Sequence, residues 1–251
     1  MNLNSNTVFI TGGGSGIGKG LAEAFHKLGN QVIISGRREQ ALKKICGAYP
    51  GMRYYVLDVT DLRSIRTVAQ KVMTDFPKLN CVFNNAGVQR YVDFSSGQPI
   101  DDAALLSELN TNVLGLIRVS AEFIPHLRKQ ADATLVNVSS GLAFVPLARF
   151  PVYCATKAAV HSFTVSLRQQ LKDSSVKVLE LIPPYVDTEL GGSSKVQPSG
   201  GPAPMPLDEF ISETMQELAR DSDEVAIGGA KNLVTATVPD SFKKAFAGMN
   251  R

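Results

Sequence analysis

Tyr153 and Lys157 stand four residues apart at the start of a segment with helical periodicity, so their side chains share one helix face. A tyrosine with its ordinary pKa of about 10 transfers protons poorly at neutral pH. A neighbouring ammonium group favours the phenolate, which lowers the tyrosine pKa toward a range useful for acid–base catalysis. The spacing alone is common in proteins without chemical meaning, so the interpretation depends on the residues that accompany the pair.

A third candidate is Ser140, which lies 13 residues before Tyr153 in the sequence NVSSG. It ends a short strand-like run, and its hydroxyl can donate a hydrogen bond to a substrate carbonyl oxygen. Tyrosine, lysine and serine together predict proton transfer at a carbonyl or alcohol oxygen. Cys154 adjoins Tyr153, and we interpret it as a small buried thiol in preference to a redox group.

The sequence TGGGSGIG, from Thr11 to Gly18, follows the first apolar run and precedes a helical segment. Glycines there let the backbone turn tightly and approach a pyrophosphate, while the N–H groups and dipole of the helix favour negative charge. A glycine cluster by itself also fits an ordinary tight turn. Its place between a strand and a helix near the start of the chain favours a dinucleotide-binding site.

The residues after the second strand-like run bear on the choice between NAD and NADP. An acidic side chain at this point would bind the adenosine ribose hydroxyls of NAD, but the chain reads Ser35-Gly36-Arg37-Arg38. Guanidinium groups suit a 2′-phosphate through their charge and their paired N–H donors. Solvated surface charges, or an arginine stacked on adenine that serves both cofactors, would explain the same residues. We expect NADP(H) as the preferred cofactor and leave NAD(H) open.

Short apolar runs alternate with longer segments of helical periodicity along the chain. We predict strands at 7–11, 31–35, 54–59, 81–84, 135–138 and 176–182, and helices at 18–28, 39–46, 61–76, 101–129 and 153–172. Apolar strands separated by helices indicate a parallel sheet covered on both faces. We therefore predict an α/β fold: a Rossmann-type doubly wound parallel sheet of six strands, or seven with a weak edge strand, in three α/β/α layers.

The whole chain, residues 1–251, is expected to form a single NAD(P)-binding Rossmann domain. Residues 191–206, GGSSKVQPSGGPAPMP, are too rich in Gly, Pro and Ser for regular structure. They fit either a disordered linker or an active-site lid, and we favour a flexible substrate lid around 188–210.

The composition argues against several classes of protein. The net charge of +3 is small and scattered, which disfavours a nucleic-acid partner. No apolar stretch approaches the roughly 20 residues of a membrane helix, and the N-terminus lacks a signal-peptide pattern, so we expect a cytoplasmic protein with no membrane partner. Three isolated cysteines, Cys46, Cys81 and Cys154, fit neither a disulfide framework nor a zinc site, and no metal is expected.

Taken together and in order, these motifs resemble the single-domain branch of the short-chain dehydrogenase/reductase family. The resemblance spans nearly the whole chain up to Thr188. It rests on the TGxxxGxG turn, Asp58-Val59, Asn84-Asn85-Ala86-Gly87, Asn112-Val113-Leu114-Gly115, the strand that ends in Ser140, and Tyr153-x-x-x-Lys157.

The resemblance implies four catalytic residues. Tyr153 would act as general acid in reduction and general base in oxidation, while Lys157 would lower its pKa and hold the nicotinamide ribose. Ser140 would orient the substrate carbonyl, and Asn112 would position a water that links Lys157 to solvent. Joined with the arginine argument above, the resemblance gives these expected cofactor-binding residues: Gly12, Gly14, Ser15, Gly16, Ile17, Gly18, Arg37, Arg38, Asp58, Val59, Asn85, Ala86, Gly87, Tyr153, Lys157, Pro183, Val186 and Thr188.

The substrate pocket is expected to be mainly apolar. Its expected residues are Ser140, Leu142, Phe144, Phe150, Tyr185 and Leu190. Such a lining suits an uncharged small-molecule ketone or aldehyde, or the corresponding alcohol. Arg90 and Arg149 would instead suit an acidic substrate, although surface charges are the simpler interpretation of both.

Two departures from the family pattern affect these expectations. Pro184 stands where the family commonly has glycine, which stiffens the segment expected near the nicotinamide carboxamide. The usual seventh strand is not evident, and we predict instead a helix over 223–237, capped by Ser222, followed by a tail with Phe242 and Phe246. By resemblance we expect a homodimer or homotetramer joined through the two longest predicted helices. The tetramer is less favoured, because tetramers of this family often use the seventh strand in their interface and that strand is not evident here.

The sequence therefore predicts an oxidoreductase of the carbonyl reductase or alcohol dehydrogenase type that transfers hydride with NADP(H). The alternative is an NAD(P)(H)-binding regulatory or sensor protein without turnover, which usually lacks part of the reactive set. A nucleotide-sugar epimerase or dehydratase is disfavoured, because those related chains are longer and carry a further substrate domain.

Overall fold

The computed structural model describes residues 1–190, 203–220, 222–236, 241, 244 and 248. Within these residues, seven parallel strands form one sheet in the order β3-β2-β1-β4-β5-β6-β7. The strands are β1 (Thr7–Thr11), β2 (Gln31–Gly36), β3 (Arg53–Val56), β4 (Cys81–Asn84), β5 (Ala133–Val138), β6 (Val176–Ile182) and β7 (Glu224–Ala226). The helices are α1 (Gly16–Lys27), α2 (Glu39–Ala48), α3 (Leu62–Asp75), α4 (Asp102–Leu109), α5 (Leu116–Leu127), α6 (Pro151–Leu171), α7 (Leu207–Leu218) and α8 (Ala230–Val234).

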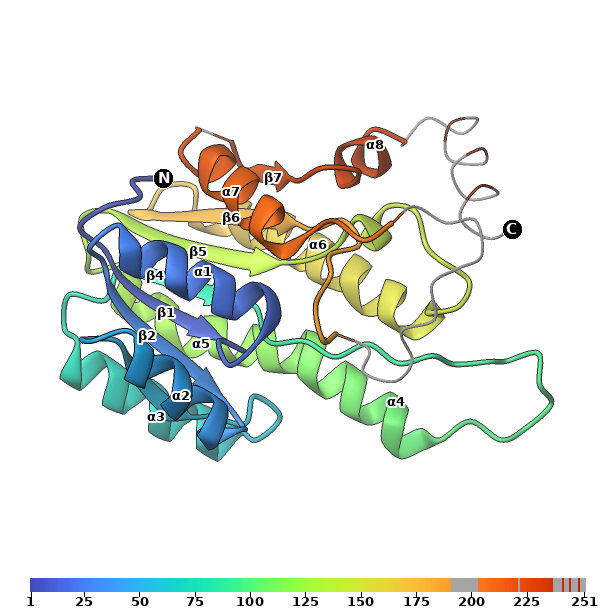
Figure 1. Cartoon of the computed structure of the whole chain (residues 1–251), viewed down its shortest axis with the longest axis horizontal. Coiled ribbons are helices and arrows are strands. Elements are labelled where there is room, and N and C mark those ends of the chain that lie inside the picture. Colours follow the sequence, from blue (N-terminus) through green and yellow to red (C-terminus); the bar gives the residue numbers. More distant parts are fainter. Residues whose placement is uncertain (191–202, 221, 237–240, 242–243, 245–247, 249–251) are drawn as a thin grey trace.

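Helices cover both faces of this sheet, as Figure 1 shows. Successive residues of β1 point to opposite faces: Val8 and Ile10 belong to one apolar cluster and Phe9 belongs to the other. The first cluster receives side chains from α1, α2 and α7, and the second from α3, α5 and α6. The Rossmann-type doubly wound fold is therefore confirmed. None of the described helices combines the length and the apolar character that crossing a membrane requires.

The C-terminal part of the fold corrects the sequence prediction. The strand β7 is the seventh, edge strand that the prediction allowed, and it pairs with β6 at residues where a helix was expected to start. Val225 at its centre is 2% exposed, so extending the sheet buries this side chain in the core beside β6. The Ser222 hydroxyl donates to the carbonyl oxygen of Glu224 and caps no helix. The predicted tail residues Phe242 and Phe246 lie outside the described residues.

The helix expected over 101–129 is divided into three parts. After α4 the chain passes into a π-helix, Asn110–Gly115, before α5 continues. Gly115 lies against the segment after β3, where a Cβ would stand 2.8 Å from the carbonyl oxygen of Val59. The wider π-turn changes which side chains face inward, and it buries Asn112 to 1% exposure.

The segment before the predicted substrate lid is hydrogen-bonded to the segment near the end of the lid. Val186 forms a parallel bridge with Met205, and the Met205 N–H donates to the carbonyl oxygen of Tyr185 at 2.8 Å. Residues 191–202, which make up much of the lid predicted around 188–210, lie outside the described residues. The helix α7 that follows was not predicted.

The sheet changes its winding direction between β1 and β4 (Figure 1). In open parallel α/β sheets, ligands bind at the carboxyl ends of the strands at such a point. The glycine turn follows β1 and the segment Asn85-Ala86-Gly87 follows β4, so both predicted cofactor motifs meet at this point of the sheet.

Candidate active site

A cavity of about 1520 Å³ lies among the segments that follow β1 to β6 and the start of α6. Most of the predicted site residues line it: Gly12, Gly14, Ser15, Gly16, Ile17, Arg37, Arg38, Asp58, Val59, Asn85, Ala86, Gly87, Ser140, Leu142, Phe150, Tyr153, Lys157, Pro183, Tyr185, Val186, Thr188 and Leu190. Gly18, Asn112 and Phe144 do not line it.

The glycine turn presents its backbone to this cavity. Gly12 and Gly16 have φ values of 68° and 52°, a region that side chains with a Cβ rarely adopt. A Cβ on Gly14 would meet the protein only at ordinary contact distance, with Leu42 Cδ2 at 3.5 Å. Ser15 begins α1 without a side-chain cap, so the first N–H groups of the helix are available to an anion.

Gly18 does not line the cavity but packs closely against the glycine turn itself. A Cβ there would stand 2.5 Å from the carbonyl oxygen of Gly12. Asn85 ties the segment after β4 to the same turn, because its Nδ2 donates to the carbonyl oxygen of Thr11 at 2.9 Å. The Asn85 N–H donates to Thr11 Oγ1 at 3.0 Å. The two cofactor motifs therefore form one rigid wall.

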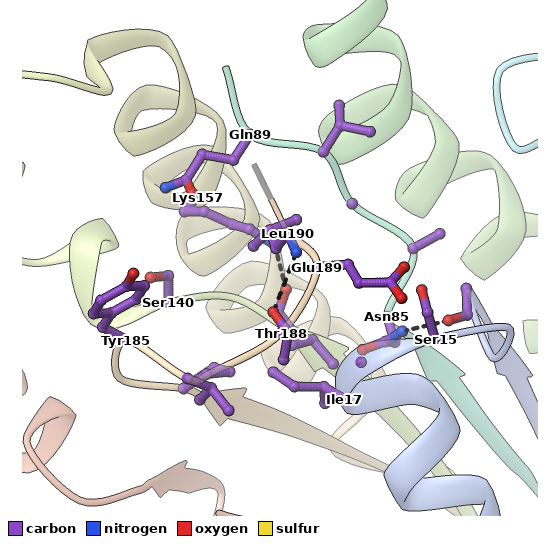
Figure 2. Close-up of a pocket in the computed structure, with 18 of the residues that line it drawn as sticks. Ser15, Ile17, Asn85, Gln89, Ser140, Lys157, Tyr185, Thr188, Glu189 and Leu190 are labelled. Atoms are coloured by element: carbon purple, nitrogen blue, oxygen red, sulfur yellow. Dashed lines mark hydrogen bonds between the residues drawn. The ribbon is translucent and has the colours of Figure 1, made fainter. Parts of the chain in front are cut away.

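Arg38 is held by two oxygen acceptors. Its Nη2 donates to Ser15 Oγ at 2.8 Å, and the guanidinium pairs with the Glu189 carboxylate at 3.3 Å. The Arg38 and Glu189 side chains are 65% and 72% exposed, so water screens a pair that contributes only about 0–1 kcal/mol. In Figure 2 the Glu189 side chain reaches toward Ser15 from the segment that follows β6. Arg37 lines the cavity beside Arg38.

Asp58 follows β3 and is fixed by its neighbours. Its Oδ1 accepts from the N–H of Thr60 at 2.9 Å and from Thr60 Oγ1 at 2.8 Å. The Asp58 N–H donates to Ser64 Oγ at 3.1 Å. These bonds close a tight turn that keeps Asp58 and Val59 on the cavity wall.

Tyr153 stands in the first turn of α6, which begins at Pro151, where a missing N–H costs nothing. Tyr153 is 6% exposed and Ser140 is 7% exposed. Burial raises the pKa of Tyr153 above its usual range, and a hydrogen bond with Ser140 partly offsets this rise. Ser140 Oγ also accepts from the N–H of Leu142 at 3.1 Å. The geometry thus joins Tyr153 to Ser140, and not to the neighbouring Ser139.

Lys157 lies one helical turn after Tyr153 and is 5% exposed. Its Nζ donates to the carbonyl oxygen of Val138 at 2.8 Å and stands 5.6 Å from the centroid of the Tyr153 ring. Burial lowers the pKa of Lys157 to about 8. Burial of the phenol sets the direction of the Tyr153 pKa shift, and the lowering expected from Lys157 is not among its causes.

Asn112 lies behind the cavity wall. Its Nδ2 donates to the carbonyl oxygen of Val88 at 2.8 Å and to Thr156 Oγ1 at 3.0 Å, and its Oδ1 accepts from the Val88 N–H at 2.8 Å. A Cβ on Gly87 would stand 3.4 Å from Asn112 Oδ1 and 3.8 Å from Lys157 Nζ. Both side chains therefore border the space beside Gly87, and the water predicted between Asn112 and Lys157 stays a prediction.

The segment after β6 keeps its predicted residues at the cavity despite Pro184. The carbonyl oxygen of Pro183 accepts from the N–H of Gly141 at 2.9 Å, which joins the ends of β5 and β6. Thr188 lies over the glycine turn, since a Cβ on Gly16 would stand 3.2 Å from Thr188 Cβ. Figure 2 shows Thr188 and Ile17 together near the start of α1.

Phe144 is placed differently from the prediction. Its ring centroid lies 4.5 Å from that of His161, because the 3₁₀ turn after Ser140 packs against α6. Phe144 therefore does not line the cavity, and its predicted substrate contact stays a prediction. Of the two arginines considered for an acidic substrate, Arg90 lines the cavity, whereas the Arg149 guanidinium lies 5.8 Å from the ring centroid of Tyr91.

His161 belongs to a polar cluster away from the cavity. Its Nδ1 lies 2.8 Å from a carboxylate oxygen of Glu180, which is 0% exposed. With Glu224, the candidate ligand atoms of the three side chains lie within 4.8 Å of one another. No metal was expected from the sequence, in which these three residues are widely spaced.

Two carboxylates near the predicted residues were also missed. Glu189 pairs with Arg38, as described above, and its sequence gives no periodic signal because it lies in an irregular segment. Glu108 is 0% exposed and accepts from the N–H of Arg90 at 3.3 Å. A signal for Glu108 was available, because it stands four residues before Asn112 and so shares its helix face.

Known proteins resemble the chain over most of its length. A family model described as short chain dehydrogenase matches residues 6–198. The Uncharacterized oxidoreductase DltE of Bacillus subtilis (strain 168) is 39% identical over 253 residues, which cover 100% of this chain and 98% of that protein. The NADP-dependent 3-hydroxy acid dehydrogenase of Schizosaccharomyces pombe is 31% identical over 194 residues, or 74% of each protein.

Solved structures share the fold. A short chain dehydrogenase from Burkholderia cenocepacia J2315 in complex with NADP superposes with a TM-score of 0.85 at 23% identity, over 100% of both chains. A short-chain dehydrogenase from Streptomyces avermitilis has a TM-score of 0.82 at 27% identity, over 98% of this chain and 96% of that one. Because the family model spans most of the sequence and the motifs meet around one cavity, the chain belongs to the short-chain dehydrogenase/reductase family of oxidoreductases.

Proposed function

We propose that the protein is an NADP(H)-dependent oxidoreductase that interconverts a ketone or aldehyde and the corresponding alcohol. The observation that carries this proposal is the buried group of Ser140, Tyr153 and Lys157 on one wall of a cavity whose opposite wall is the glycine turn. This arrangement places a proton donor and a pyrophosphate cradle around the same space.

The cofactor preference rests on the groups around the glycine turn. Gly14 leaves space for a pyrophosphate, and the first N–H groups of α1 can bind it. Arg37 and Arg38 stand after β2, where guanidinium groups suit a 2′-phosphate. The Schizosaccharomyces pombe relative is NADP-dependent, and neighbours of the fold were solved with NADPH, from Sphingobium yanoikuyae, and with NAD, from Burkholderia phymatum. We therefore propose NADP(H) as preferred and leave NAD(H) open.

Tyr153 is the proton-transfer residue in this proposal. A nicotinamide cofactor held in this cavity would supply the hydride chemistry, to the carbonyl carbon in reduction and from the alcohol carbon in oxidation. Ser140 donates a hydrogen bond to the substrate oxygen and holds it beside Tyr153. In reduction the Tyr153 hydroxyl gives its proton to that oxygen and becomes a phenolate, and in oxidation the phenolate takes the proton back. Because burial raises the pKa of Tyr153, the phenol keeps its proton until the oxygen beside it becomes basic.

Lys157 completes the proton transfer. With a pKa of about 8, its side chain is mainly an ammonium at neutral pH. This charge stabilises the phenolate that forms on Tyr153 and can return a proton to it. A water above Gly87, between Asn112 and Lys157, would then link the ammonium to solvent.

The lining of the cavity indicates the substrate class. Leu142, Phe150 and Leu190 present apolar surface near Ser140 and Tyr153. Aromatic and aliphatic groups without charge fit such a surface best. We propose a hydrophobic ketone or aldehyde, or its alcohol, as substrate.

We also propose that the protein assembles as a homodimer or homotetramer. Leu109, Leu114 and Val165, on the helices expected to form the interface, are 42%, 41% and 43% exposed. A second copy related by twofold symmetry would cover such side chains on both partners at once.

The proposal is tested by following nicotinamide absorbance with purified protein, NADPH or NADH, and a panel of aryl and aliphatic ketones and aldehydes. We expect turnover with NADPH and much slower turnover with NADH. Comparable rates with both cofactors would refute the preference assigned to Arg37 and Arg38 but leave the enzyme assignment in place.

The Tyr153→Phe variant is the matched control, since it removes one hydroxyl and keeps the ring. We expect kcat to fall by about 10²–10⁴-fold while the affinity for NADPH is retained. Tight cofactor binding without turnover by the unaltered protein, across the panel, would instead favour an NADP(H) sensor.

A further inference from the structure

His161, Glu180 and Glu224 bring three potential metal ligands together at the edge of the sheet. They come from α6, β6 and β7, and their candidate ligand atoms all lie within 4.8 Å of one another. β7 is the edge strand next to β6 (Figure 1). None of the three residues lines the cavity described above. The cluster therefore lies apart from the proposed catalytic residues.

The sheet places two carboxylates side by side in this cluster. Glu180 and Glu224 are direct partners in the parallel register of β6 and β7, so their side chains leave the sheet on the same face. Like charges opposite each other on neighbouring strands repel, which destabilises the pairing of the strands. The imidazole of His161 lies near both carboxylates but supplies at most one positive charge. A cation bound between the two carboxylates would balance their charge.

The Glu180 carboxylate is buried, and only one of its oxygens has a partner. Glu180 is 0% exposed, and its Oε2 lies 2.8 Å from His161 Nδ1. Its Oε1 is also buried and has no hydrogen-bond partner among the described residues. A buried charge is costly unless it is paired or binds a metal ion. The unpartnered oxygen therefore indicates a ligand beside the imidazole and the second carboxylate.

Cationic side chains on the same helix have other acceptors. The Nζ of Lys157 donates to the carbonyl oxygen of Val138 at 2.8 Å. The Nε of Arg168 donates to a carbonyl oxygen of β6 at 2.9 Å and lies 3.7 Å from the Asp223 carboxylate. Neither lysine nor arginine therefore satisfies Glu180 Oε1, which leaves this oxygen available to a metal ion.

The imidazole of His161 is held in place on one side and open on the other. The ring centroids of His161 and Phe144 lie 4.5 Å apart at an interplanar angle of 60°. This packing restricts the rotation of the imidazole, as suits a ligand that must keep its orientation. The His161 side chain is 29% exposed, so an ion can reach the cluster from solvent.

We propose that His161, Glu180 and Glu224 bind one divalent transition-metal ion, with Zn²⁺ as the best match, which joins α6 to the edge strand β7. An imidazole nitrogen combined with carboxylate oxygens suits Zn²⁺, whereas Mg²⁺ and Ca²⁺ prefer oxygen ligands alone. Three protein ligands leave the fourth tetrahedral position to a water molecule.

Binding replaces a hydrogen bond with metal–ligand bonds. The proton that His161 Nδ1 shares with Glu180 Oε2 passes to solvent when the ion binds. Around a tetrahedral ion with bonds of about 2.0–2.2 Å, two ligand atoms stand about 3.4 Å apart. The present separation of 2.8 Å therefore has to widen by only about 0.6 Å. Because β7 has only three residues, the ion would add a cross-link where the sheet is shortest.

The test is a metal titration of the purified whole chain after treatment with EDTA and removal of the chelator. Co²⁺, a visible-absorbing substitute for Zn²⁺, should bind with one equivalent and be displaced by Zn²⁺. Zn²⁺ at ten times its Kd should raise the thermal midpoint by about 3–6 °C. Mg²⁺ at the same concentration should leave the midpoint unchanged, because one of the three ligands is a nitrogen.

Three variants locate the ion. Glu224→Gln keeps the size of the side chain and removes its charge, and His161→Gln removes the imidazole. Loss of a partner outside the ligand set typically lowers metal affinity 10–100-fold, so each of these variants should lower the affinity for Zn²⁺ by about 10²-fold or more. Asp223→Asn is the matched control, because it removes the neighbouring carboxylate, whose side chain is 56% exposed. It should change the affinity for Zn²⁺ by less than about twofold.

The results decide between a metal site and a simple ion pair. Equal affinity for Zn²⁺ in Glu224→Gln, His161→Gln and the unaltered protein would overturn the proposal. An equal loss in Asp223→Asn would overturn it too, since any carboxylate at this edge would then attract the ion. The Co²⁺ titration needs no variant, so it decides the matter even if a substitution prevents folding. Failure of the unaltered protein to bind one equivalent of Co²⁺ or Zn²⁺ would mean that His161 and Glu180 form only an ion pair.

Discussion

The free energy of unfolding should depend on pH, because the Glu108 carboxyl is buried in the folded protein. Its pKa is raised from an ordinary value of 4.5 to about 7 in the folded protein. The folded chain therefore binds this proton more tightly than the unfolded chain. The stabilisation is fully present below pH 4.5 and is lost as the pH rises to about 7. At about 1.4 kcal/mol per pKa unit, the ionised carboxylate costs the folded state up to about 3 kcal/mol.

The Glu108→Gln variant removes this cost, because glutamine does not ionise. The difference in unfolding free energy, variant minus unaltered protein, should increase by about 2 kcal/mol between pH 5 and pH 7.5. Urea unfolding followed by circular dichroism at closely spaced pH values measures this difference directly. The exposed pair of Glu122 and Arg66 provides the comparison, since Glu122→Gln should change stability by less than about 1 kcal/mol throughout. A Glu108→Gln difference that stays constant with pH would refute the reasoning, because it would mean that Glu108 titrates alike in both states.

Three other substitutions test the geometry of the cavity wall. Glu189→Gln frees the guanidinium of Arg38 to bind a phosphate. The KM for NADPH should therefore fall by about 2–5-fold, while the KM for NADH stays unchanged. Equal changes of both KM values would contradict this. Gly18→Ala places a methyl group 2.5 Å from the carbonyl oxygen of Gly12. The free energy of unfolding in urea should therefore fall by about 1–3 kcal/mol. An unchanged urea midpoint would show that the glycine turn can move to make room for the methyl group. Gly87→Ala fits at ordinary contact distances but fills the space expected to hold a water, so kcat should fall about tenfold or more while the unfolding midpoint is kept.

The elements that position the motifs could be predicted because each is specified locally. The strands β1, β4 and β6 have the predicted bounds, since a strand buried on both faces is apolar throughout and is broken by polar or glycine residues. The glycine turn and the pair of Tyr153 and Lys157 follow from spacing within one turn or one helix. Their meeting around one cavity follows from the winding of a parallel sheet, which brings the carboxyl ends of the strands to one edge.

The parts that could not be predicted depend on contacts between distant segments. A seventh edge strand was allowed but could not be placed, because β7 forms where Val225 gains burial beside β6, while the local sequence there also suits a helix. The π-helix depends on the close approach of Gly115 to the segment after β3. The pKa of Tyr153 was expected to fall because of Lys157, but its direction is set by burial, which spacing does not reveal. The position of Phe144 also depends on a contact between distant segments, because packing on α6 turns its ring toward His161.

The two carboxylates that the motifs do not include act on cations that the motifs do include. Glu189 pairs with Arg38, where the 2′-phosphate of NADP(H) would bind. Burial lowers the pKa of Lys157, and Glu180 and then Glu108 oppose this lowering. The first carboxylate is exposed and competes with the anionic ligand, so its removal should strengthen binding. Glu108 is buried, so a ligand in the cavity does not displace it. Burial thus decides whether a carboxylate near a cation can be displaced by a ligand or stays in place.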